Sequence, residues 1–134
     1  MKMNLLIVGG FYHIGFAIFH LFFWQLFNWK KDLASLSIIN RAVMQILNLC
    51  LTFVFIVVAY ISIYYSSDLV STSLGRIIIG SISMFWLVRI GEQLFFFGLK
   101  KRVSIILTII FIIGFIIYLI PVLNYIWLIQ NCSN

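Results

Sequence analysis

Charged residues are scarce in this chain, and acidic residues are the scarcest of them. Only 9% of the 134 residues are charged, and three are acidic: Asp32, Asp68 and Glu92. A carboxylate-bridged pair of metal ions needs more acidic ligands than one copy of the chain offers. The two cysteines, Cys50 and Cys132, lie far apart, so there is no C-x-x-C redox motif and no cysteine-rich metal site.

Hydrophobic residues are what the chain has in excess. They make up 64% of the sequence, and 18% of all residues are aromatic, which is typical of membrane proteins and far outside the range of soluble domains. Four apolar stretches, 5–27, 41–65, 74–99 and 103–129, each reach the roughly 20 residues that a membrane-spanning helix needs. We therefore predict an all-α integral membrane protein: a single transmembrane domain (1–134) that forms a four-transmembrane-helix bundle with short loops, and an interfacial segment at 28–40.

Motifs of soluble cofactor-binding domains are also missing. The chain contains neither the glycine-rich G-x-G-x-x-G pattern nor a phosphate-binding P-loop. The four apolar stretches leave almost no residues for a soluble domain. We therefore expect the activity of this protein to take place within the bilayer, and the residues identify no cofactor.

The basic residues indicate how the chain is oriented in the membrane. The net charge is +6, and two clusters, Lys30 with Lys31 and Lys100 with Lys101 and Arg102, fall between the first two and the last two apolar stretches. The positive-inside rule places both loops in the cytoplasm and therefore both termini on the outer side. We expect a protein of the bacterial cytoplasmic (inner) membrane, whose partner is the lipid bilayer and not nucleic acid.

Polar residues inside the apolar stretches are the candidates for function. Arg89, Glu92 and Gln93 share one face of a helix (i, i+3, i+4), and intramembrane charges are costly unless they are paired. At about 1.5 Å per residue, polar side chains of three stretches come out at one depth, on the order of 10 Å below the cytoplasmic boundary. The predicted binding cluster consists of His20, Arg41, Gln45, Asn48, Arg89, Glu92 and Gln93.

Each of these residues also has a structural interpretation. Arg89 and Glu92 would then form an ion pair that sets the helix register, or Arg89 would extend to the headgroups. Gln45 and Asn48 would be hydrogen-bonding contacts between helices, and His20 a packed histidine. No metal site is predicted, because the candidates His20, Glu92 and His13 would need further ligands from solvent or from a second chain.

The pattern favours a small membrane protein that binds or conducts a small polar or charged species. We expect a transporter or a channel-like protein that works as a homo-oligomer or with a membrane-protein partner, because four short helices expose nearly as much surface as they bury. One alternative is an intramembrane enzyme that acts on a lipid or quinone with His20 and Glu92 as acid and base. Another is a non-catalytic subunit whose polar layer docks a partner.

Overall fold

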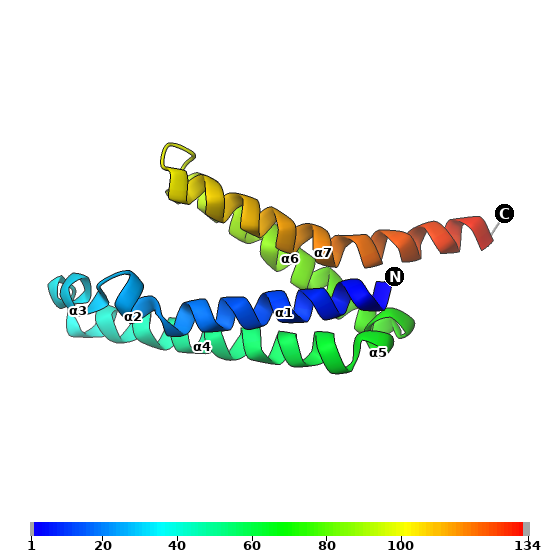
Figure 1. Ribbon diagram of the computed structural model, residues 1–134, viewed down its shortest axis with the longest axis horizontal. Coiled ribbons are helices and arrows are strands. Elements are labelled where there is room, and N and C mark those ends of the chain that lie inside the picture. The colour runs from blue at the N-terminus through cyan, green and yellow to red at the C-terminus, as the bar shows by residue number, and fades with distance from the viewer. Residues whose placement is uncertain (1, 133–134) are drawn as a thin grey trace. The chain divides into compact units, whose positions relative to one another are not determined.

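The chain is entirely helical in a computed structural model that describes the backbone of residues 2–132 and the side chains of residues 3–124. Two compact units divide it: an N-terminal unit, Gly10–Ile61, and a C-terminal unit, Met1–Gly9 with Ser62–Asn134. The helices are labelled in Figure 1. In chain order they are α1 (Lys2–Leu21), α2 (Phe23–Leu26), α3 (Trp29–Asp32), η1 (Leu33–Ser35), α4 (Ile38–Tyr64), α5 (Ser66–Ser71), α6 (Ser73–Phe96) and α7 (Arg102–Cys132).

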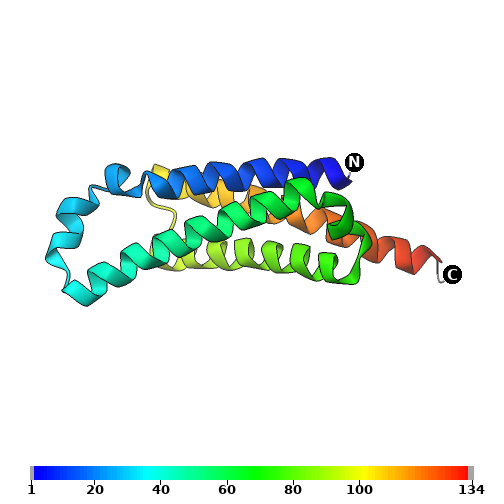
Figure 2. The same cartoon turned by 90° about the horizontal axis from the view of Figure 1, so that it is seen from below.

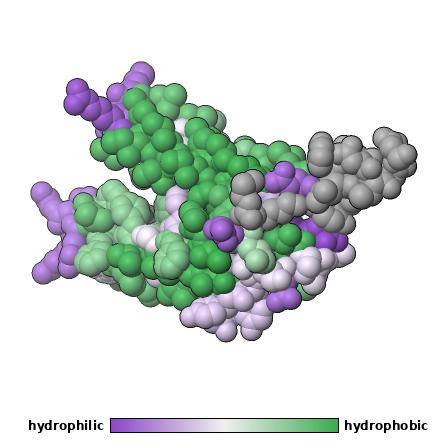
Figure 3. Space-filling model, turned by 45° about the vertical axis from the view of Figure 1, so that its right-hand side comes forward, coloured by the Kyte–Doolittle hydropathy of each residue, from purple (hydrophilic) through white to green (hydrophobic). Residues whose placement is uncertain are grey.

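Four of these helices are long and apolar enough to cross a membrane, as the sequence predicts. They contain the segments Met3–Leu21, Ile38–Tyr64, Ser73–Phe96 and Arg102–Asn124. Large apolar side chains lie exposed along all four, and a large part of the surface seen in Figure 3 is hydrophobic. In water such a surface would drive aggregation, whereas in a bilayer the lipid chains cover it.

Helices α1 and α4 run antiparallel in the N-terminal unit. His13 of α1 lies beside Phe55 of α4, and further along the two helices His20 bonds to Asn48. Residue numbers therefore rise along α1 as they fall along α4. The ring centroids of His13 and Phe55 are 5.7 Å apart. Aromatic and small side chains thus form the seam between these two helices.

The first predicted stretch is not one continuous helix, because its last turns belong to an irregular linker. The stretch 5–27 is expected to be one helix, but α1 ends at Leu21, and Phe22 (φ −87°, ψ 3°) separates it from the four-residue α2. Asn28 then adopts the left-handed conformation (φ 48°), which turns the chain into α3. Figure 2 shows this linker (blue to cyan) as a wide turn between α1 and α4.

Helices α6 and α7 form the hairpin of the C-terminal unit. The Trp86 and Phe111 rings stack with centroids 5.7 Å apart, and the Ser83 hydroxyl donates to the Phe115 carbonyl at 3.4 Å. The contacts again run in opposite directions along the two helices. Helix α7 contains Pro121, whose ring removes one backbone donor, and the helix bends along its length in Figure 1.

Within the C-terminal unit, the start of α1 lies against a completely buried hydrogen bond. The Tyr118 hydroxyl lies 2.8 Å from the Ser62 hydroxyl, and neither side chain is exposed. A Cβ atom at Gly9 would lie 2.7 Å from the Tyr118 hydroxyl. Only glycine therefore lets the backbone of α1 approach this tyrosine so closely.

The serine-rich segment 66–73, which falls in one of the predicted short loops, contains the helix α5. Thr72 caps α6, because its hydroxyl accepts a hydrogen bond from the Gly75 N–H at 2.9 Å and donates to the Asp68 carbonyl at 2.8 Å. A Cβ atom at Gly75 would meet the backbone of Asp68 and Leu69. The α5–α6 corner therefore requires glycine at this position.

We predict that Gly75→Ala lowers the free energy of unfolding by about 1–3 kcal/mol, because the added methyl group overlaps with backbone that cannot move aside. Gly80→Ala is the matched control, since Gly80 lies in the same helix with open space around it. This control should be neutral or raise stability by up to about 1 kcal/mol. Unfolding by sodium dodecyl sulfate, followed by circular dichroism, measures both; equal effects would contradict the tight corner.

Candidate functional site

The predicted polar cluster is divided between the two units. His20, Arg41, Gln45 and Asn48 belong to the N-terminal unit, and Arg89, Glu92 and Gln93 belong to the C-terminal unit. The structure brings together three pairs within these units: His20 with Asn48, Arg89 with Glu92, and Gln93 with Ser104.

His20 and Asn48 form a double hydrogen bond between α1 and α4. The His20 Nδ1 atom lies 2.8 Å from the Asn48 Oδ1 atom, and the Asn48 Nδ2 atom donates to the His20 carbonyl at 3.0 Å. Both side chains are buried. The Thr52 hydroxyl donates to the Asn48 carbonyl at 2.8 Å, one turn further along α4.

This arrangement selects one protonation form of the imidazole. A carbonyl oxygen only accepts hydrogen bonds, so the amide nitrogen of Asn48 must face the His20 carbonyl. The amide oxygen therefore faces Nδ1, which must carry the proton. In neutral His20 the Nε2 atom is then the acceptor, the nitrogen that takes up a proton when the ring becomes cationic.

Aromatic rings surround the imidazole of His20. The Phe23 ring stacks on it with a centroid distance of 4.2 Å and an angle of 21° between the planes. The rings of Phe55 and Phe19 contact its edges at 5.2 and 5.9 Å. His13, only 1% exposed, lies on the same seam against Phe55 and Tyr12. Both histidines are thus packed residues of the helix seam, and for His20 this agrees with the structural interpretation.

Arg41 and Gln45 do not share the hydrogen bonds of His20 and Asn48. The Arg41 Nε atom donates to the Leu33 carbonyl at 2.9 Å, and its Nη2 atom donates to the Ala34 carbonyl at 3.2 Å. This guanidinium therefore closes the linker that precedes α4. Gln45 is half-buried, and no hydrogen bond of its side chain is found among the described residues.

Arg89 and Glu92 form an ion pair on the surface of α6. The Arg89 Nη1 atom donates to the Glu92 Oε2 atom at 2.6 Å, and the two side chains are 31% and 45% exposed. The guanidinium also lies over the Phe111 ring of α7, 4.9 Å from its centroid. The sequence predicts this pairing by its spacing of three residues, but not the contact with Phe111.

Gln93 points in another direction and takes part in the α6–α7 turn. Its Nε2 atom donates to the Ser104 hydroxyl at 2.9 Å, and the Ser104 hydroxyl donates to the Gly98 carbonyl. The Thr108 hydroxyl donates to the Ser104 carbonyl at 2.8 Å. Sequence reasoning left Ser104 out of the cluster. Ser104 comes directly after the turn and lies opposite Gln93 if the two helices are antiparallel. That position could have identified it from the sequence.

Metal ligands are not gathered anywhere in the part of the chain that the structure describes. No group of three or more His, Cys, Asp or Glu side chains lies within reach of one ion among these residues. Cys50 is a free, exposed thiol, and the side chain of Cys132 lies outside the described residues.

Comparisons with protein-family models, with curated proteins and with solved structures found no match to this chain.

We predict that Asn48→Ala lowers the free energy of unfolding by about 1–2 kcal/mol, because it leaves the His20 Nδ1–H and the His20 carbonyl without their amide partner. Gln45→Ala is the matched control: the same helix loses a side chain that forms no described hydrogen bond, and its effect should stay within about 0.5 kcal/mol. Denaturation by sodium dodecyl sulfate measures both variants. Equal losses would show that the double hydrogen bond does not hold α1 to α4.

Proposed function

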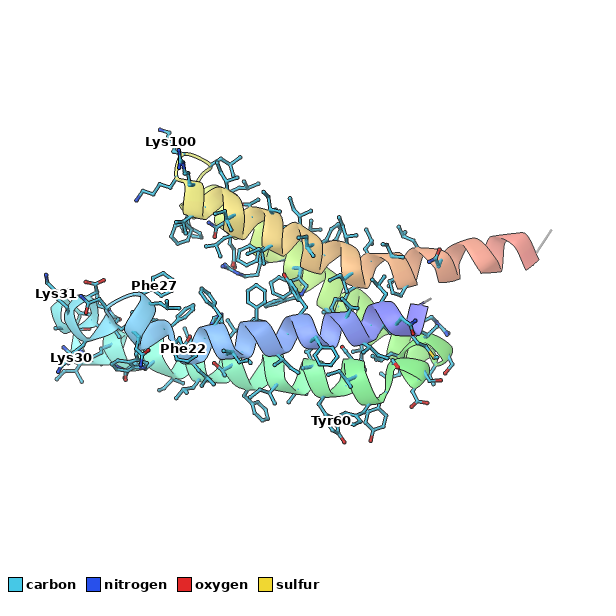
Figure 4. The ribbon with its side chains drawn as sticks, viewed as in Figure 1. Phe22, Phe27, Lys30, Lys31, Tyr60 and Lys100 are labelled. Atoms are coloured by element: carbon cyan, nitrogen blue, oxygen red, sulfur yellow. The ribbon has the colours of Figure 1, made fainter. Side chains whose placement is uncertain are left out.

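We propose that this chain is a four-span protein of the bacterial inner membrane that binds or conducts a small polar or charged species. In this proposal the four long helices form a bundle with both termini on the outer side. Lys30 and Lys31 in α3, and Lys100, Lys101 and Arg102 at the α6–α7 turn, lie in the cytoplasm. Figure 4 labels Lys30 and Lys31 in the linker and Lys100 in the α6–α7 turn.

The observation that carries this proposal is the exposed ion pair of Arg89 and Glu92. Arg89 lies seven residues and Glu92 four residues before the end of an apolar helix at Phe96, hence about 10 and 6 Å from that end along the axis. Charges at such a depth are expensive if lipid chains surround them. An aqueous path or a bound polar species would solvate this pair, whereas a pair that served only to hold the fold would be expected to be buried.

The chemistry of the pair suits reversible binding of ions and protons. Arg89 remains cationic and can hold an anion, while Glu92 can exchange a proton once its partner is occupied. Gln93 and Asn48 are already engaged in hydrogen bonds within their own hairpins. In the proposed site these two amides keep the helices in register, and Arg89 with Glu92 makes contact with the transported species.

A second candidate is a non-catalytic subunit that docks a partner through this face of α6. The exposure of Arg89 and Glu92 favours it as well, because a helix of a partner protein or of a second copy could cover the two charges. Here the ion pair would set the specificity of assembly. The two candidates predict different effects when the Glu92 carboxylate is removed.

We predict that Glu92→Gln abolishes proton-coupled flux, with a loss of more than about tenfold, since an amide cannot exchange the proton. The purified chain is reconstituted in vesicles, and proton entry is followed with pyranine under a potassium diffusion potential, with chloride or phosphate as the anion. Asp68→Asn makes the same chemical change at an exposed carboxylate of α5 and should leave flux unchanged.

Light scattering coupled to gel filtration on the same preparations separates the two candidates. Transport requires that Glu92→Gln keep the assembly mass and lose flux. Docking requires no flux in the natural chain and a smaller assembly in the variant. A stable, fully active protein with Glu92→Gln and with Arg89→Leu would refute the role of the ion pair.

A further inference from the structure

The α6–α7 turn combines exposed aromatic rings with exposed cations. Phe95, Phe96 and Phe97 end α6 with their rings exposed, Phe95 by 84%. After Gly98 and Leu99 follow the cations Lys100, Lys101 and Arg102, all of them exposed. Figure 4 shows Lys100 in this turn, pointing away from the two helices.

The positive charge of this turn has no acidic counterpart nearby in the chain. Segment 93–102 contains no Asp or Glu, and Glu92 is paired with Arg89. The first turn of α7 carries no acidic residue either, although the amino end of a helix is itself positive. Three cations are thus placed where they repel each other and the helix end, and an anion would relieve that repulsion.

The linker of the N-terminal unit carries its basic residues beside an acidic one. Lys30 and Lys31 are followed by Asp32. The Arg41 guanidinium donates hydrogen bonds to the carbonyls of Leu33 and Ala34. Trp29 beside them is buried. The two basic clusters that look alike in the sequence therefore differ in their charge balance.

Hydrogen bonds hold the backbone of the α6–α7 turn in one conformation. Gly98 is left-handed (φ 60°), its carbonyl accepts from the Ser104 hydroxyl, and Ser104 in turn accepts from the buried Gln93. The Phe97 N–H donates to the carbonyls of Gln93 and Leu94. The cations consequently follow the aromatic residues at a spacing that the structure determines.

We propose that this turn is a binding site for the headgroups of anionic phospholipids. The rings of Phe95, Phe96 and Phe97 lie in the acyl-chain boundary, and Lys100, Lys101 and Arg102 reach the phosphodiester level of the same leaflet. Gln93 is a positioning residue here, since it acts through Ser104 on the turn. Lipid binding at this turn does not depend on which species Arg89 and Glu92 bind.

Native mass spectrometry of the full chain in detergent, titrated with phosphatidylglycerol or phosphatidylcholine, tests the site. The first phosphatidylglycerol should bind more tightly than phosphatidylcholine. Replacing Lys100, Lys101 and Arg102 with glutamine should weaken the binding of this first phosphatidylglycerol by at least about tenfold, since each cation near a headgroup raises the affinity about fivefold. The matched control, Lys30→Gln with Lys31→Gln, should change this dissociation constant by less than about twofold.

Two further measurements keep the test decisive if the triple variant fails to fold. In the natural chain, higher ionic strength should weaken the binding of phosphatidylglycerol and leave the binding of phosphatidylcholine unchanged. The single variant Lys101→Gln should likewise weaken the binding of phosphatidylglycerol alone. Equal affinity for both lipids, or an equal loss in the Lys30 and Lys31 control, overturns the proposal. Displacement of the lipid by inorganic phosphate beyond the effect of chloride at equal ionic strength would also overturn it, in favour of a site for free phosphate.

Discussion

Polar groups surrounded by apolar side chains must find partners, and this requirement shapes both helical hairpins. Between apolar helices in lipid there is little hydrophobic gain on association, so close packing and hydrogen bonds determine which helix faces fit together. In the N-terminal unit the double hydrogen bond of His20 and Asn48 supplies that contact. In the C-terminal unit two hydrogen-bonded pairs supply such contacts: Gln93 with Ser104, and Ser62 with Tyr118.

This requirement separates residues that serve the fold from residues that remain available. Arg41 closes the linker before α4, and Gln93 holds the α6–α7 turn, so the donors of both are used within their own units. Among the described residues, Arg89 and Glu92 contact each other and the face of Phe111, and they stay partly exposed. This partial exposure is the reason why the proposed function is assigned to the ion pair.

The two basic turns show how tertiary structure gives similar sequences different properties. Lys30 and Lys31 are followed by Asp32, while Lys100, Lys101 and Arg102 have no acidic neighbour and follow three exposed phenylalanines and the left-handed Gly98. Charge alone would assign both turns to the same side of the membrane. The surroundings of the cations indicate which of the two has an unbalanced positive field.

The sequence was sufficient for the coarse architecture. Runs of Leu, Ile, Val and Phe about 20 residues long predict helices, because a backbone in lipid must satisfy its own hydrogen bonds. The all-helical fold and four long apolar helices follow from that constraint alone. The spacing of Arg89 and Glu92 likewise predicts their ion pair, since residues three apart on a helix are neighbours.

Only the tertiary structure decided how the other polar residues pair. Arg41, Gln45 and Asn48 are spaced i, i+4, i+7, which puts them on one stripe of α4. Yet the Arg41 side chain turns back to the linker, and Asn48 bonds to His20 across the hairpin. The break at Phe22 and the left-handed Asn28 follow from backbone conformations that composition does not reveal. Partners across a helix seam depend on register and rotation, and those are settled when the helices pack.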